Sequence, residues 1–217
     1  MSGAAGTTDA AVRKWNRAAG ALDTKNRGEE MRYGPYKRAL FAKACGRTLL
    51  VAAGTGIDFR YLPPGLDVAA IDFAPRMLAL ARKRLGESAS PVTLLEADVT
   101  ALDFPDASFD TVLTSCTFCS VPDPVRGLRE LRRVLKDDGR LLMFEHVRVS
   151  NPWLGFMMDV MNPLIRRFGP DINRRTADNV RAAGFRIERE FNVYLDMVKL
   201  FEAVKDPGWA GSKREEP

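Results

Sequence analysis

The alternation of short apolar runs with segments of helical periodicity constrains this chain most. Each apolar run is short and continuous, which is typical of strands that are buried on both faces of a parallel sheet. Strands that alternate with helices imply right-handed crossovers and therefore predict a doubly wound α/β sheet. The strand-like runs are 48–53, 68–71, 92–96, 111–114 and 140–144. One helix-like segment starts at Pro75 and another runs over 125–135.

The last part of the chain breaks this alternation. A short helix over 176–183 is followed by two strand-like runs, 185–191 and 195–204, that only a short turn can join. These runs bring the expected sheet to seven strands, with an antiparallel C-terminal strand that belongs to an antiparallel strand pair at one edge. The predicted boundaries are an N-terminal helical arm (1–45), a central domain (46–206) with a lid insertion at 151–175, and a disordered tail (207–217).

Charge is concentrated at the N-terminus. The 217 residues have a formal net charge of +5, and residues 1–45 contain nine Lys and Arg against four Asp and Glu, so the remaining residues are neutral as a group. A neutral body with a basic arm is not the pattern of a nucleic-acid-binding domain, and nucleic acid is not expected as a partner. The oligomeric state cannot be predicted from this pattern.

The compartment is predicted from what the sequence lacks. Its start has no secretory apolar core, and no apolar run is long enough to span a bilayer. Cys45, Cys116 and Cys119 do not have the spacing of a disulfide framework or a structural zinc site, so no metal is expected. These features predict a cytoplasmic protein. A redox or metal role for the Cys116-x-x-Cys119 pair is the alternative to small side chains that line a pocket.

A glycine-rich turn follows the first predicted strand. Gly54-Thr55-Gly56 runs directly into an expected helix, and Asp72 ends the next strand, where a carboxylate can bind ribose hydroxyls. A dinucleotide fold has a third glycine three residues after the second, but Phe59 occupies that place. The pattern therefore favours a nucleoside without phosphates, such as S-adenosylmethionine. A nicotinamide-dependent oxidoreductase and a non-catalytic nucleoside-binding protein are the other classes it allows.

Five ordered blocks extend this pattern: G-T-G, I-D-F-A-P-R-M-L, E-A-D-V, D-F-P-D-A-S-F-D-T-V, and L-R-E-L-R-R-V-L-K-D-D-G-R-L-L-M-F-E-H. From Trp15 to Lys205 the chain resembles the class I S-adenosylmethionine-dependent methyltransferases, in particular the ubiquinone/menaquinone methyltransferase-like branch. The resemblance implies a Rossmann-like fold, S-adenosylmethionine as cofactor and S-adenosylhomocysteine as product. The residues that it implies for cofactor binding are Gly54, Thr55, Gly56, Asp72, Phe73, Met77, Asp98, Val99 and Ser115.

The chain departs from the family at two positions of this turn. The family has an acidic residue four places before the first of these two glycines and a further glycine two places before it, where this chain has Leu50 and Ala52. Leu50 cannot accept a hydrogen bond, so we expect backbone carbonyls or Asp58 to bind the methionine amino group instead. The alternative for Asp58 is an acidic residue that the dipole of a helix N-terminus favours.

The residues at the acceptor side are predicted from position. Glu145 and His146 end the fifth strand, where open α/β sheets face their ligands, and they are the candidate catalytic residues, although both could be structural. The arm and the lid insertion are predicted to build the acceptor pocket. Its candidate substrate-binding residues are Trp15, Tyr33, Tyr36, Cys119, Trp153, Met157 and Met161.

The lid insertion is apolar and rich in methionine, so it suits either a buried lid or contact with an anionic membrane at its inner face. It also resembles the caps of bacterial phospholipid N-methyltransferases and of methyltransferase-like thiol methyltransferases. We therefore expect a small hydrophobic or amphiphilic, lipid-like acceptor, such as a phospholipid amine or an alkyl thiol. Methylation of a quinone ring carbon is the alternative.

Overall fold

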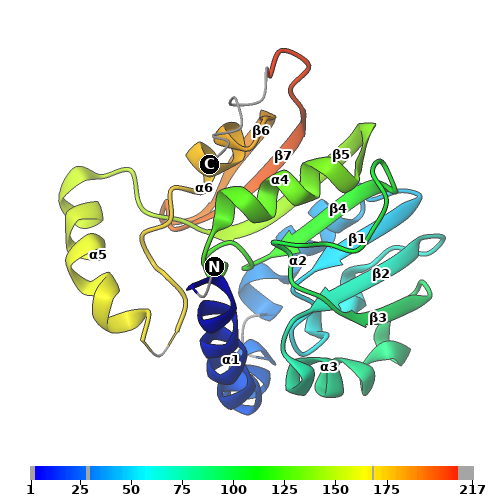
Figure 1. Cartoon of the computed structure of the whole chain (residues 1–217), viewed down its shortest axis with the longest axis horizontal. Coiled ribbons are helices and arrows are strands. Elements are labelled where there is room, and N and C mark those ends of the chain that lie inside the picture. Colours follow the sequence, from blue (N-terminus) through cyan, green and yellow to red (C-terminus); the bar gives the residue numbers. More distant parts are fainter. Residues whose placement is uncertain (1–2, 28–29, 168, 210–217) are drawn as a thin grey trace.

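A computed structural model describes residues 3–27, 30–167 and 169–209, and it contains one seven-stranded sheet in the order β3-β2-β1-β4-β5-β7-β6 (Figure 1). Only β7 runs antiparallel to the rest, because it pairs antiparallel with both β5 and β6. This confirms the predicted sheet. The strands are β1 (Arg47–Val51), β2 (Asp67–Asp72), β3 (Val92–Glu96), β4 (Phe109–Ser115), β5 (Leu135–His146), β6 (Phe185–Tyr194) and β7 (Val198–Lys205).

The central strand β1 explains why the apolar runs are continuous. Its residues Leu49, Leu50 and Val51 are buried, since helices cover both faces of the sheet. β1 pairs in parallel with β2 on one side and with β4 on the other. The chain therefore changes direction across the sheet between β1 and β4, and such a switch point opens a crevice at the carboxyl ends of the strands.

Helices α4 (Pro124–Val134) and α6 (Thr176–Ala182) pack on one face. Asp123 caps α4 by accepting a hydrogen bond from the Arg126 amide, and Leu128 and Leu131 are buried against the sheet. The other face packs against α2 (Glu30–Phe41), α3 (Pro75–Arg82) and the 3₁₀ helix η1 (Ile57–Tyr61). A second 3₁₀ turn, η2 (Leu85–Glu87), follows α3.

The N-terminal arm consists of α1 (Gly3–Arg27) and α2. Leu40 and Phe41 of α2 belong to the core beneath the sheet, whereas α1 packs on α3 through Ala19, which contacts Ala74 and Met77. Trp15 and Leu22 of α1 therefore reach the carboxyl ends of the strands.

Three segments differ from the sequence-based expectations. The helix expected directly after Gly56 is only the short 3₁₀ helix η1, and Pro63 and Pro64 follow it. β5 begins at Leu135, which was expected to end the preceding helix. Of the predicted tail, residues 210–217 lie outside the described part, but Trp209 packs against Gly184 and lies 4.6 Å from the Arg132 guanidinium.

Helix α5 (Pro152–Ile165) stands apart from the sheet, at the left of Figure 1. It is the predicted lid, yet it does not lie over the carboxyl ends of the strands. None of the described helices is long and apolar enough to cross a membrane.

Candidate cofactor and acceptor pocket

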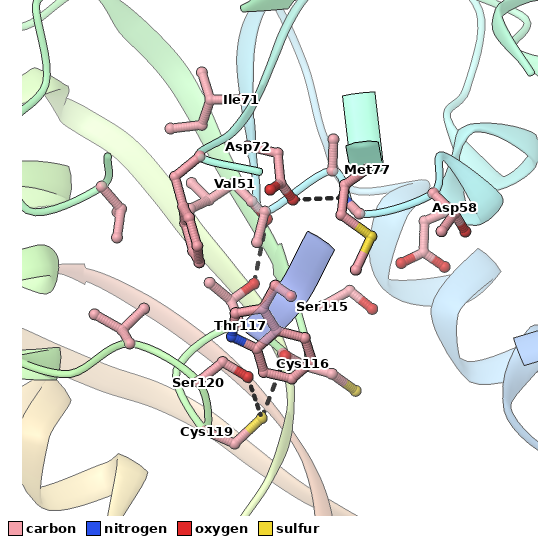
Figure 2. Close-up of a pocket in the computed structure, with 18 of the residues that line it drawn as sticks. Val51, Asp58, Ile71, Asp72, Met77, Ser115, Cys116, Thr117, Cys119 and Ser120 are labelled. Carbon is pink, nitrogen blue, oxygen red and sulfur yellow. Dashed lines mark hydrogen bonds between the residues drawn. The ribbon is translucent and has the colours of Figure 1, made fainter. Parts of the chain in front are cut away.

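A pocket opens at the carboxyl ends of β1, β2, β4 and β5, at the switch point of the sheet (Figure 2). Residues of α1, α2 and the segment after α5 complete its walls. The lining residues are Trp15, Leu22, Lys37, Val51, Ala52, Ala53, Gly54, Thr55, Ile57, Asp58, Ile71, Asp72, Phe73, Met77, Ala97, Val99, Ser115, Cys116, Thr117, Cys119, Ser120, Val121, His146 and Pro170.

The backbone holds Asp72 in place at the end of β2. Its Oδ2 accepts a hydrogen bond from the Gly54 amide and its Oδ1 one from the Ala74 amide, both at 2.9 Å. Burial raises the pKa of Asp72, while these amides act in the opposite direction. Each carboxylate oxygen has a second lone pair, so Asp72 can accept from two neighbouring hydroxyls of one ligand.

The two glycines of the turn differ in their surroundings. Gly54 has a φ of +55° and lines the pocket, and a Cβ at this position would meet only the Ala52 carbonyl, at 3.8 Å. Gly56 has a φ of +79° and does not line the pocket. A Cβ there would lie 2.8 Å from Cα of Ala81 and 2.9 Å from the Phe59 ring. Gly54 thus lets the backbone approach a ligand, whereas Gly56 lets the turn pack on α3.

Two hydroxyl groups in the pocket indicate a polar ligand. Thr55 Oγ1 and Ser115 Oγ are buried and have no hydrogen-bond partner within the described part of the chain. Buried polar groups in proteins are nearly always paired, so unpaired hydroxyls that line a pocket suit a ligand. Together with Asp72 they provide an acidic acceptor for a ribose and donors for polar groups, which fits S-adenosylmethionine.

The wall beyond Asp72 is apolar. Ile71, Phe73, Met77 and Val99 line it, as a flat aromatic ring of a nucleoside requires. The neighbouring Asp98 does not line the pocket, and its Oδ1 accepts from the amide and the hydroxyl of Thr100, both at 2.8 Å. The role predicted for Asp98 therefore stays a prediction.

A buried ion pair lies in the same pocket. Lys37 Nζ of α2 is 2.8 Å from Asp58 Oδ1 of η1, and it lies 5.1 Å from the centre of the Phe144 ring. Burial alone would lower the pKa of Lys37, but the Asp58 carboxylate raises it above its ordinary value. The lysine therefore carries a permanent positive charge. Lys37 is not among the site residues predicted from the sequence, because nothing in the sequence distinguishes it from the other basic residues of the arm.

The loop after β4 places a thiol beside the histidine. Cys116 Sγ lies 3.3 Å from His146 Nδ1, and Cys116 has a φ of +54°, which is rare for a residue with a side chain. Burial raises the pKa of Cys116 well above its ordinary value and that of Cys119 to about 12, so both remain thiols. Within the described residues no group of three or more His, Cys, Asp or Glu could hold a metal ion.

Glu145 is fully buried behind the pocket and does not line it. Its carboxylate accepts hydrogen bonds from Thr114 Oγ1 at 2.8 Å and from the amides of Thr117 and Phe118 at 3.2 and 3.1 Å. Burial nevertheless raises the pKa of Glu145 to about 7. Its contacts make it a positioning residue for the loop that carries Cys116 and Cys119, rather than a group that faces the acceptor.

Most of the expected acceptor-side residues lie outside the pocket, since only Trp15 and Cys119 of that set line it. Tyr33 packs edge-on against Phe144 in the core, and Tyr36 lies 6.1 Å from Phe191 on the outer side of α2. On α5, Trp153, Met157 and Met161 are 71%, 43% and 49% exposed. The segment after α5 reaches the pocket through Pro170 instead.

Comparison with known protein families matches residues 49–143 to a methyltransferase domain. The chain is 34% identical over 165 residues to a demethylmenaquinone methyltransferase from Renibacterium salmoninarum, covering 76% of this chain and 66% of the relative. It is 31% identical over 195 residues to a demethylmenaquinone methyltransferase from Clavibacter sepedonicus, covering 79% and 78%. A phosphatidylethanolamine N-methyltransferase from Cereibacter sphaeroides is 38% identical over 103 residues, covering 46% and 51%.

The match covers about half of the length of some of these curated relatives and about two thirds or more of others. Among solved structures, an S-adenosylmethionine-dependent methyltransferase from Thermotoga maritima superposes with a TM-score of 0.68 at 21% identity, covering 89% of this chain and 99% of that one. At that identity the likeness extends to the fold alone.

Proposed function

The chain belongs to the class I S-adenosylmethionine-dependent methyltransferases, in the ubiquinone/menaquinone methyltransferase-like branch, and we propose that it methylates a ring carbon of a reduced, lipid-soluble quinone. The observation that carries this proposal is the similarity to demethylmenaquinone methyltransferases, which extends over most of the chain. Quinone methylation was the alternative in the sequence analysis, and the relatives favour it over the phospholipid amine or alkyl thiol.

S-adenosylmethionine, when bound, supplies an electrophilic methyl group on a sulfonium sulfur. In this proposal Asp72 accepts the two ribose hydroxyls, and the apolar wall of Ile71, Phe73 and Met77 contacts the adenine. The two unpaired hydroxyls, Thr55 Oγ1 and Ser115 Oγ, provide further polar contacts.

The ion pair between Lys37 and Asp58 suits the amino-acid end of the cofactor. Methionine carries an α-ammonium and an α-carboxylate, and a buried pair of opposite charges offers a partner to each of them. Asp58 would thereby replace the acidic residue that the family has where this chain has the buried Leu50. Lys37 Nζ donates a hydrogen bond to Asp58 Oδ1, and an ammonium group has two further donors for a carboxylate.

The remaining part of the pocket, near Cys116, Cys119 and His146, is assigned to the acceptor. Burial keeps Cys116 protonated, and a thiol that donates to His146 Nδ1, 3.3 Å away, would leave the imidazole proton on Nε2. An Nε2–H donor stabilises a quinol oxygen as it gains negative charge, and this charge activates the neighbouring ring carbon. The activated ring carbon would take the methyl group that the bound cofactor supplies, with S-adenosylhomocysteine as the leaving group, and the ring proton would leave to water.

The test is methyl transfer from labelled S-adenosylmethionine by the full chain. The acceptors are a chemically reduced demethylated naphthoquinone with a short isoprenoid tail, phosphatidylethanolamine vesicles and an alkyl thiol. We expect label in the quinone fraction and a large loss of turnover in His146→Ala, with cofactor affinity retained.

Each other result has a defined meaning. Label in the lipid or the thiol would replace the quinone proposal by that acceptor, and the phosphatidylethanolamine N-methyltransferase relative makes the lipid amine the second candidate. Tight cofactor binding with no transfer to any of the three acceptors would contradict the proposal. Unchanged turnover in His146→Ala would remove the role given to the histidine.

A further inference from the structure

Helix α5 is amphipathic, but its apolar face is turned to solvent and its polar face to the protein. An ordinary helix of a globular protein turns its apolar face to the core and its polar face to water. In α5 the polar side chains contact the body, while large apolar side chains point to solvent.

The inner face of α5 is held by polar contacts. Asp159 pairs with Arg148 at 2.9 Å and also accepts from Asn173. The Asn162 side chain donates to Asp171 at 2.7 Å and accepts from the Ile172 amide at 2.9 Å. Gly155 lies directly over Arg148, since a Cβ on it would lie 2.3 Å from the guanidinium. These contacts fix the rotation of the helix about its axis.

The outer face of α5 is apolar and exposed. At about 100° per residue, its exposed apolar positions fall within an arc of about 160°. Their exposed fractions lie between 43% and 71%, so nothing in the described chain covers this face. The residues of this apolar face are Trp153, Leu154, Phe156, Met157, Val160, Met161 and Leu164.

A second exposed apolar group adjoins the start of α5. The turn between β6 and β7 carries Tyr194, Leu195 and Met197, which are 38%, 69% and 39% exposed. The Asp196 side chain in this turn accepts a hydrogen bond from the Ser150 amide, just before α5 begins. The turn and the N-terminal end of α5 are therefore tied to each other.

Exposed basic residues lie beside the apolar face of α5. Arg166 and Arg167 are exposed directly after α5, and Arg13 and Arg17 of α1 are also exposed. Lys14 of α1 donates to the Arg166 carbonyl at 2.6 Å, so these basic residues belong to adjoining segments. An apolar helix face with a tryptophan and with flanking arginines suits the interface of an anionic bilayer.

We propose that the apolar face of α5, together with the β6–β7 turn, docks this protein on the surface of an anionic lipid bilayer. The helix has 14 residues and a length of about 21 Å, so it lies in the plane of the interface rather than across the membrane. The alternative occupant of this face is a second copy of the chain, which would make the protein a dimer.

This proposal rests on the proposed function, because it explains how a lipid-soluble acceptor reaches the pocket. The segment after α5 lines the pocket with Pro170, and the Asp171 amide donates to the Cys119 carbonyl at 2.8 Å. Lys14 also donates to the Gly169 carbonyl. The C-terminal end of the docking helix therefore leads to the rim of the acceptor side.

The test is co-flotation of the full chain with two kinds of vesicle. One contains phosphatidylcholine alone, and the other also contains phosphatidylglycerol, at about one anionic lipid in three. The variant is Leu154→Glu/Val160→Glu/Leu164→Glu, which changes only exposed positions of α5. Leu95→Glu on β3, where Leu95 is 37% exposed, is the matched control. We expect binding to the anionic vesicles, a loss of at least about tenfold in the triple variant, and no loss in Leu95→Glu.

Calorimetry with S-adenosylhomocysteine separates this proposal from the proposed function. We expect unchanged affinity in the triple variant, because α5 does not line the cofactor end of the pocket. Equal flotation of wild type and triple variant, or no flotation with either vesicle, would overturn the docking proposal. A wild-type dimer that the triple variant converts to a monomer would also overturn it, by assigning the face to a second copy. If the wild type did not bind S-adenosylhomocysteine, the proposed function would be contradicted instead.

Discussion

Two carboxylates of the pocket, Asp72 and Asp58, have different partners, and these partners assign them to different parts of one ligand. Asp72 is oriented by the amides of Gly54 and Ala74 at the end of β2, whereas Asp58 is bound to the lysine of α2. An acid fixed by neutral amides keeps its charge available for hydroxyls. An acid paired with a cation suits a ligand that also carries both charges.

We predict that Asp72→Ala and Asp58→Asn weaken different contacts with the cofactor, Asp72→Ala those with the ribose and Asp58→Asn those with the amino-acid group. Asp72→Ala should weaken both S-adenosylmethionine and 5′-methylthioadenosine by about a hundredfold or more, since two charge-assisted hydrogen bonds are lost. Asp58→Asn should weaken S-adenosylmethionine about tenfold and leave methylthioadenosine unchanged, because that molecule has no amino-acid group. Calorimetry measures both, and Asp67→Ala at the exposed start of β2 is the control.

Unchanged affinity of Asp72→Ala for either nucleoside would contradict the ribose assignment. An equal loss for both ligands in Asp58→Asn would show that the ion pair supports the fold of the pocket rather than the methionine group.

At this scale the sequence predicts some site residues and misses others for physical reasons. Gly54 and Asp72 follow from strand ends at a fixed separation. Lys37 could not be found, because its position in the pocket depends on how α2 packs beneath the sheet. Glu145 and His146 were predicted together, but neighbouring residues of a strand point to opposite faces, so they cannot both face one ligand.

At the scale of elements, the glycine turn between β1 and η1 depends on close packing against α3. We predict that Gly56→Ala lowers the free energy of unfolding by about 3 kcal/mol or more, because strain at positive φ adds to an overlap with Ala81. Gly65→Ala is the matched control, since Gly65 also has a positive φ, +86°, but nothing within 4 Å of the added Cβ. It should cost only about 1 kcal/mol.

Chemical denaturation of the two variants decides this prediction. Equal losses in Gly56→Ala and Gly65→Ala would mean that the backbone conformation, and not the contact with α3, sets the requirement for glycine. We also expect folded Gly56→Ala to bind the cofactor with unchanged affinity, because Gly56 contacts α3 and does not line the pocket.

The element boundaries were predictable to different degrees. Strands buried on both faces appear as continuous apolar runs, so β1 and β2 were predicted within a residue or two, and the half-buried edge strand β3 was predicted at its observed bounds. The sequence predicted a helix directly after Gly56 but not that it is the short 3₁₀ helix η1. For α5 the sequence predicted an apolar helix but not which of its faces is turned to solvent. The contacts of Asp159 and Asn162 with residues outside the helix set its rotation about its axis.

At the scale of the whole molecule, the net charge of +5 belongs to an arm whose two helices have separate tasks. Helix α2 completes the core and places Lys37 in the pocket, and α1 covers the pocket with Trp15 and Leu22 and adjoins the segment after α5. Of the exposed basic residues of the arm, Arg13 and Arg17 belong to α1, the helix that adjoins the segment after α5.

The buried Glu145 links the protonation of this site to the stability of the whole molecule. Its pKa is about 7 in the folded chain against 4.5 for the free side chain. Between these values the folded state keeps a proton that the unfolded state has released, so the free energy of unfolding must fall as pH rises from about 4.5 to about 7, and level off above that. The shift corresponds to a change of up to about 3 kcal/mol.

Comparison with Glu145→Gln isolates this effect, because glutamine resembles the protonated carboxyl group and does not titrate. Its amide oxygen can still accept from Thr114, whose hydroxyl lies 2.8 Å from Glu145 Oε1. Denaturant unfolding at pH 5, 6, 7 and 8 should show the wild type losing about 2–3 kcal/mol relative to the variant. Asp196, with a pKa lowered to about 2 by Lys199, changes stability only at lower pH and does not interfere. Parallel curves for the two proteins would mean that the three donors around Glu145 keep it ionised throughout this range, and that the loop after β4 is held by a permanent charge.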